Sequence, residues 1–125
     1  MPKANSGIFI HTAYQEKGWP EKGYEVQVNQ SHADWRKSGS LYSFNDVREV
    51  YVNDGEWYTY HIIVKGDQAT VKINDEVVME YDESEDADRP ANAEEKKFDK
   101  GTIALQAHDP ESVIFYRSVK IKLLD

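Results

Sequence analysis

The sequence predicts an all-β domain, because apolar and polar residues alternate with a period of two through most of the chain. β-Branched and aromatic residues fill these stretches, and no helical stripe of useful length interrupts them. The chain has 125 residues, 39% of them hydrophobic. A length of about 100–200 residues is usual for one domain, so we expect a single compact domain over residues 1–125.

The strands are predicted in order from this alternation. In residues 6–12, Ile8 and Ile10 alternate with Phe9 and His11. In residues 23–29, three apolar residues alternate with Glu25, Gln27 and Asn29. The full set of predicted strands is 6–12, 23–29, 40–44, 57–65, 68–74, 76–81, 101–107 and 112–123.

Turn residues separate the later strands. Gly66-Asp67 closes strand 57–65, and Asn74-Asp75 joins 68–74 to 76–81 as a tight hairpin, since both residue types tolerate a positive φ. Residues 82–100 hold 8 acidic and 4 basic residues, and we expect them to form an acidic surface loop.

Charge and composition exclude several classes of function. The chain carries 15 basic and 23 acidic residues, a net charge of −8, which makes nucleic acid a poor partner. No apolar run approaches the roughly 20 residues of a membrane span, and the first residues show no signal-peptide core. Cysteine is absent, so disulfides and thiolate chemistry are excluded, but the cellular compartment stays open.

Two polar stripes are candidates for a binding or catalytic face. One is Glu25, Gln27 and Asn29; the other ends in Gln106 and His108. Each could equally be an ordinary solvent-facing side of a sheet, and the histidine an ordinary surface residue.

The aromatic residues are likewise candidates either for ligand binding or for packing in the core. Trp19 and Trp35 lie in predicted loops, where an aromatic face could stack on a sugar ring. Trp57 and Tyr60 lie in or beside an apolar strand, where packing in the core is expected.

Several short motifs in a fixed order resemble the 3-keto-disaccharide hydrolase domain family. They are residues 5–10 (NSGIFI), 23–28 (GYEVQV), 38–42 (SGSLY), 55–60 (GEWYTY), 71–78 (VKINDEVV), 101–108 (GTIALQAH) and 113–121 (VIFYRSVKI). The resemblance implies a concanavalin A-like jelly-roll sandwich of two antiparallel sheets, here without the family's usual first strands. The chain departs from the family at His11, where arginine is usual, and at Asn29, where aspartate is common.

The resemblance also implies a reaction. The family cleaves glycosides that carry a ketone at carbon 3, by removing the C2 proton and expelling the glycosidic oxygen. We therefore expect Glu25 or His108 to be the base. Gln27, with His11 or a bound divalent cation, would face the oxyanion. The expected substrate-binding residues are Gln27, His11, Gln106, Tyr42, Trp19 and Trp35.

Two alternatives remain open: a non-catalytic carbohydrate-binding module, and an inactive fragment of the enzyme. Exposed sheet edges further predict a homodimer. The family resemblance suggests a bacterial periplasmic or extracellular location.

Overall fold

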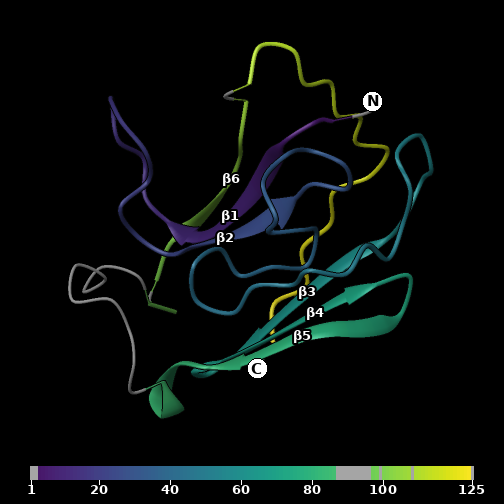
Figure 1. Ribbon diagram of the computed structural model, residues 1–125. Helices are drawn as coiled ribbons and strands as arrows, with labels where there is room; N and C mark the ends of the chain where they lie inside the picture. The colour runs from purple at the N-terminus through teal and green to yellow at the C-terminus, as the bar shows by residue number, and fades with distance from the viewer. Residues whose placement is uncertain (1–2, 87–96, 99, 108, 125) are drawn as a thin grey trace.

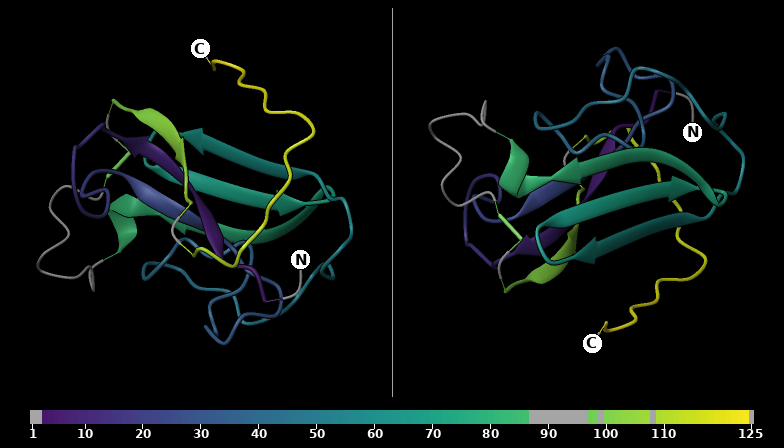
Figure 2. Two further views of the ribbon diagram at one scale, coloured as in Figure 1. Left: turned by 90° about the horizontal axis from the view of Figure 1, so that it is seen from above. Right: turned by 90° about the horizontal axis from the view of Figure 1, so that it is seen from below.

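The computed structural model describes residues 3–86, 97–98, 100–107 and 109–124. Six strands form two antiparallel sheets, which face each other as two layers (Figures 1 and 2). The first sheet has the order β2-β1-β6 and the second the order β3-β4-β5. The strands are β1 (Ser6–Thr12), β2 (Tyr24–Val28), β3 (Tyr60–Lys65), β4 (Gln68–Ile73), β5 (Glu76–Asp82) and β6 (Thr102–Leu105), with a 3-10 turn, η1 (Glu83–Glu85), after β5. The predicted all-β sandwich is confirmed.

The core lies between the two sheets. In the first sheet Ile8 pairs with Val26 and Ile10 with Tyr24, so that apolar side chains of both strands point to the same face. Val71 of β4 faces them from the second sheet and is fully buried. The buried cluster consists of Ile10, Tyr24, Val26, Leu41, Val71, Met79 and Tyr81. Burial of apolar surface of this kind is the main favourable term in folding.

One tyrosine joins the two sheets through the core. Tyr60 begins β3, and its hydroxyl donates a hydrogen bond to the backbone carbonyl of Gln27 in β2, at 2.7 Å. The same hydroxyl accepts a hydrogen bond from the backbone N–H of Gly39. Burial raises the pKa of the Tyr60 hydroxyl well above its ordinary value, so the group stays a proton donor. The second sheet is thereby tied to the strand that carries Glu25 and Gln27.

The chain continues from β4 through a hairpin into the acidic region. β4 and β5 are joined across Asn74 and Asp75, whose φ angles are 50° and 67°, as predicted. Beyond β5, the carboxylate of Glu83 accepts hydrogen bonds from the Tyr24 hydroxyl (3.1 Å) and the Phe98 N–H (2.8 Å). Most of the predicted acidic loop, residues 87–96 and 99, lies outside the described residues.

Two predicted strands were wrong, and four were longer than the observed ones: 23–29 by one residue at each end, 68–74 by one residue, and 57–65 and 101–107 by more. Residues 40–44 form a tight turn, in which Leu41 bridges Val26 on one side and Asn45 on the other, and Ser43 has a φ of 67°. Residues 112–123 form no strand, because within the described part of the chain no strand lies beside them to complete a ladder. Strand 57–65 begins only at Tyr60, and 101–107 is paired only over Thr102–Leu105.

The prediction for Trp57 was also wrong. Its side chain is 57% exposed, whereas Tyr60 packs on the core as expected. Trp57 precedes the first paired residue of β3, so it is not held against the opposite sheet. Among the described residues, none belongs to a helix long and apolar enough to cross a membrane.

We predict that Tyr60→Phe lowers the free energy of unfolding by about 1–3 kcal/mol, because the Gly39 N–H and the Gln27 carbonyl lose a buried partner. Urea unfolding followed by fluorescence measures the loss. Tyr51→Phe is the matched control, since the Tyr51 hydroxyl donates to the Glu49 carboxylate in an exposed position; it should change the free energy by less than about 0.5 kcal/mol. Equal losses in the two variants would contradict the role given to Tyr60.

Candidate functional site

The first sheet carries polar residues on the face turned away from the core. Gly7 of β1 lies opposite Gln27 of β2, and Phe9 lies opposite Glu25. These pairs alternate with the core-facing pairs, so all four residues share the outer face. Gln27 is nevertheless only 1% exposed, and Phe9 is buried as well. A buried polar side chain on an outer face requires specific hydrogen bonds, because its groups are cut off from water.

The amide of Gln27 supplies these bonds. One atom of its amide lies 2.8 Å from the Ser6 carbonyl oxygen and 3.1 Å from Glu25 Oε1. Both neighbours are acceptors, so this atom is the amide nitrogen Nε2, which donates to both. The two N–H groups of Gln27 are therefore used, and one of them holds the carboxylate of Glu25.

Gly7 makes room for this carboxylate. A Cβ atom at Gly7 would lie 2.7 Å from Cγ of Glu25 and nearer still to its Oε1 atom. Cβ atoms in real proteins do not approach other atoms so closely. On the other side of Gly7, its carbonyl accepts the Gln106 N–H at 2.9 Å. Glu25 and Gln27 of β2, and Gln106 directly after β6, thus lie on either side of Gly7 in the central strand β1. The predicted strands 23–29 and 101–107 lie in one sheet, on either side of β1; a shared site of their polar residues stays a prediction, and His108 lies outside the described residues.

Tyr42 lies beside this group. Its backbone N–H donates to the Glu25 carbonyl at 2.9 Å, and its ring is stacked under Arg36, whose Cζ is 4.7 Å from the ring centre. Partial burial, followed by the negative charge of Asp34, raises the pKa of the Tyr42 hydroxyl, and the Glu25 carboxylate acts in the same direction. Tyr42 is therefore a protonated phenol at neutral pH and can donate a hydrogen bond near Glu25.

Arg36 is held in place by two carboxylates. Its Nε is 3.3 Å from Asp46 Oδ2, and its Nη1 is 3.8 Å from Asp34 Oδ1. Burial raises the pKa of Asp46, while Arg36 acts in the opposite direction. The charge of Arg36 is balanced locally, so its contribution to the face is the stacked guanidinium plane rather than a free charge.

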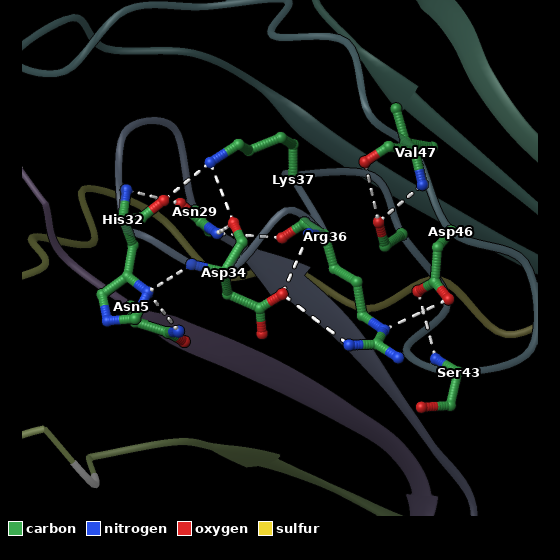
Figure 3. A network of polar contacts seen from close by, with 10 residues as sticks. Asn5, Asn29, His32, Asp34, Arg36, Lys37, Ser43, Asp46 and Val47 are labelled. Atoms are coloured by element: carbon green, nitrogen blue, oxygen red, sulfur yellow. Dashed lines mark hydrogen bonds and ion pairs between the residues drawn. The ribbon is translucent and has the colours of Figure 1, made fainter.

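Asn29 organises the loop that carries these residues (Figure 3). Its Nδ2 donates to the carbonyl oxygens of Asp34 (2.8 Å) and Arg36 (2.9 Å), and its Oδ1 accepts the N–H of His32 (2.8 Å). Its backbone also exchanges hydrogen bonds with Ser38. An aspartate could not donate to two carbonyl groups, so the asparagine at this departure from the family pattern suits the loop as it is folded here.

His32 is a further member of this network (Figure 3). Its Nδ1 accepts the Asp34 N–H at 3.0 Å and lies 3.3 Å from Asn5 Nδ2. Because a backbone N–H can only donate, Nδ1 of His32 is the acceptor in this network.

No sequence pattern predicted His32, Asp34, Arg36 and Asp46, because they lie in loops without periodicity. The available signal was the run of polar and charged residues that directly follows the Glu25 strand.

Of the remaining predicted residues, Trp35 adjoins the Tyr42 group, because Arg36 Cζ is also 4.9 Å from the Trp35 ring centre, whereas His11 and Trp19 lie elsewhere on the first sheet. A β-bulge lies between Phe9 and Thr12, and His11 within it has a φ of 53°. The bulge turns the His11 side chain toward the core side, where the centres of the His11 and Phe98 rings are 5.7 Å apart. Trp19 lies in the loop that joins β1 to β2, at the opposite end of this strand pair from the loop of Trp35. Trp35 is 40% exposed, and Arg48 stacks on its ring, with Cζ 4.0 Å from the ring centre.

The expected divalent cation is not supported by the described residues. Within residues 3–86, 97–98, 100–107 and 109–124, no group of three or more histidine, aspartate or glutamate side chains is placed to hold a metal ion. A metal in the reaction stays a prediction.

The protein is thus an all-β sandwich in which the Glu25 carboxylate, hydrogen-bonded by the Gln27 amide, lies on the outer face of a sheet. Residues 1–122 match the 3-keto-alpha-glucoside-1,2-lyase-like domain family, and the chain belongs to that family. This confirms the family resemblance found in the sequence motifs.

A solved structure supports the fold. A protein of Parabacteroides distasonis, named as a "putative glycosyl hydrolase", is 22% identical to this chain and superimposes with a TM-score of 0.62. The match covers 84% of this chain and 59% of that one, so the chain spans somewhat over half the length of its structural neighbour. A search of curated protein sequences found no match.

We predict that Gly7→Ala lowers the free energy of unfolding by about 1–3 kcal/mol, because the new methyl group overlaps the side chain of Glu25. If this overlap is the cause, Gly7→Ala should cost much less in a Glu25→Ala background, where the methyl group has space. A double-mutant cycle in urea measures this coupling. Additive losses would show that Glu25 does not lie across Gly7.

We also predict that Asn29→Asp destabilises the domain by about 1–3 kcal/mol at pH 7, since the part-buried carbonyl groups of Asp34 and Arg36 lose the amide donor and face a carboxylate. That environment raises the pKa of the new carboxyl, so the loss should shrink as the pH falls toward 4 and the group takes up a proton. Unfolding at both pH values measures it. Asn53→Asp, at an exposed asparagine bonded to Glu56, is the control and should be nearly neutral.

Proposed function

We propose that this domain cleaves 3-keto-glycosides by β-elimination, with Glu25 as the base that removes the C2 proton. Support comes from the family to which the chain belongs, which is described as a 3-keto-alpha-glucoside-1,2-lyase-like domain. The single observation that carries the proposal is the Gln27 amide nitrogen 3.1 Å from Glu25 Oε1, above the space left by Gly7.

Because the substrate carries a ketone, a single carboxylate is sufficient to remove the C2 proton. A carbonyl at C3 acidifies the C–H bond at C2, because the electron pair left behind is delocalised onto the carbonyl oxygen as an enolate. Glu25 takes the proton; the enolate then re-forms the ketone, makes a C1–C2 double bond and expels the glycosidic oxygen, which takes up a proton as it leaves. Water adds across the double bond in a second step. No oxidant or reductant is consumed.

The surrounding residues receive the following roles. Gln27 is a positioning residue, since both of its N–H groups are occupied by Ser6 and Glu25, and the oxyanion role first given to it passes to another donor. The Tyr42 phenol, kept protonated by burial and by neighbouring carboxylates, is the proposed donor to the enolate oxygen. His108, the alternative base, stays a prediction.

A second function is a non-catalytic carbohydrate-binding module on the same face. The exposed ring of Trp35 favours it, because partly exposed aromatic side chains in loops are common in binding surfaces. The same substrate analogue can therefore bind in both cases, and only turnover separates the two proposals.

The deciding experiment measures release of the aglycone from a chromogenic 3-keto-glucoside, with the unoxidised glucoside as the substrate control. We predict turnover of the keto substrate alone, and a fall of about 10²–10⁴-fold in kcat for Glu25→Gln. Glu25→Gln keeps an acceptor for Gln27 and should stay folded. Glu56→Gln, at an exposed carboxylate near Asn53, is the matched control and should retain full activity.

Retained activity in Glu25→Gln would remove this residue from the mechanism. Calorimetric binding of the keto-glucoside without any turnover in the wild-type protein would favour the binding module. Addition of a divalent cation and of a chelator in the same assay tests the predicted metal.

A further inference from the structure

Two arginine side chains and two aromatic rings form a stack beside Glu25. The Arg36 guanidinium contacts both rings, with Cζ 4.7 Å from the ring centre of Tyr42 and 4.9 Å from that of Trp35. Arg48 contacts the Trp35 ring, with Cζ 4.0 Å from its centre. Tyr42 is the member next to Glu25, because its backbone N–H donates to the Glu25 carbonyl. Arg48 is therefore the outer end of the stack.

The charges of the two arginines are balanced differently. Arg36 forms ion pairs with Asp34 and Asp46 (Figure 3). The exposed side chain of Arg48 forms no ion pair or hydrogen bond with the residues that the structure describes. The carboxylate of Glu49, its neighbour in sequence, accepts a tyrosine hydroxyl instead. The stack thus ends in a cation whose N–H groups are available to a ligand.

The Trp35 ring holds this cation ready for a carboxylate. A guanidinium that stacks on a ring through its face keeps its N–H groups at its edges, in the plane of the group. Two parallel N–H groups at one edge match the two oxygens of a carboxylate. Because the ring already restricts the Arg48 side chain, less freedom is lost when a ligand binds it.

The overall charge of the chain does not prevent such a contact. The net charge of −8 repels anions in general. At physiological ionic strength, however, salt screens repulsion between exposed charges that are more than about 8 Å apart. A hydrogen-bonded carboxylate lies well within that distance of the Arg48 guanidinium. The attraction at contact therefore decides whether an anionic group is held at this point of the surface.

The place of Arg48 in the stack indicates which part of a substrate it reaches. Arg36 and Trp35 separate it from Tyr42, and each contact in the stack spans 4.0–4.9 Å. Arg48 is thus farther from Tyr42 than the width of one sugar ring. In a 3-keto-glycoside bound at Glu25, the group on C1 is the part that extends beyond the ring. This group is the one that leaves in the elimination.

We propose that Arg48 binds a carboxylate on the leaving group, so that the domain selects 3-keto-glycosides whose aglycone or second sugar is anionic. The proposal rests on the elimination assigned to Glu25 and names the substrate class of that site. Arg48 does not touch the reacting atoms and holds the substrate equally before and during the reaction. Its loss therefore raises KM for anionic substrates and leaves kcat unchanged.

Two 3-keto-glucosides test this selection, one with a 4-carboxyphenyl and one with a 4-carbamoylphenyl leaving group, which differ in charge but are close in shape. We expect the ratio of their kcat/KM values, carboxylate over carboxamide, to fall about three- to tenfold in Arg48→Met, through KM. Comparison of this ratio between proteins cancels the different reactivity of the two leaving groups. Arg117→Met, which removes an arginine stacked on the Trp57 ring (Cζ 4.2 Å from its centre), is the matched control and should keep the wild-type ratio.

Equilibrium binding makes the test independent of turnover. The unoxidised 4-carboxyphenyl and 4-carbamoylphenyl glucosides are titrated by calorimetry at physiological ionic strength, and we expect the same three- to tenfold change in the ratio of their Kd values in Arg48→Met. This change without turnover of either keto substrate would refute the elimination and leave the anion site standing. A ratio that is the same in the wild-type protein and Arg48→Met, or an equal change in Arg117→Met, would overturn the proposal. Failure of the carboxylate glucoside to bind at millimolar concentration would overturn it as well.

Discussion

The hydroxyl of Tyr60 connects the two layers of this sandwich, and the arrangement of the functional face depends on it. Apolar contacts between the sheets are non-directional and allow one layer to slide over the other. The bond from Tyr60 to the Gln27 carbonyl is directional and is buried, where an unpaired carbonyl or N–H group is costly. It therefore sets the position of β2 relative to β3, and with it the outer face on which Glu25 and Gln27 lie.

The proposed base is held in position by the residues around it. Glu25 lies over Gly7, where a larger residue would displace it, and it accepts a hydrogen bond from Gln27. A carboxylate held in one rotamer loses little freedom when substrate binds, which is the benefit of preorganised catalytic groups. Tyr42 and Arg36 come from the following loop, so the face is completed by residues that lie close to β2 in sequence but outside any strand.

That loop is stabilised by one asparagine side chain. Asn29 ends the Glu25 strand and satisfies two carbonyl groups and one N–H group of residues 32–36. Loops that carry function are usually less rigid than the sheets they extend from. Here the hydrogen bonds of Asn29 fix the backbone of the loop relative to the end of β2. They also hold Arg36 where its guanidinium can stack on the Tyr42 ring.

Local sequence determined where β1, β2, β4 and β5 lie, which faces of β1 and β2 are apolar, and where the Asn74-Asp75 turn falls. These features depend on side-chain periodicity and on the φ preferences of single residues. Tertiary structure decided the rest. Residues 40–44 and 112–123 alternate like the true strands, but a strand exists only where a second backbone completes its ladder. The bulge that turns His11 toward Phe98, and the buried partners of Tyr60, Gln27 and Asn29, likewise depend on groups distant in sequence, which no local pattern records.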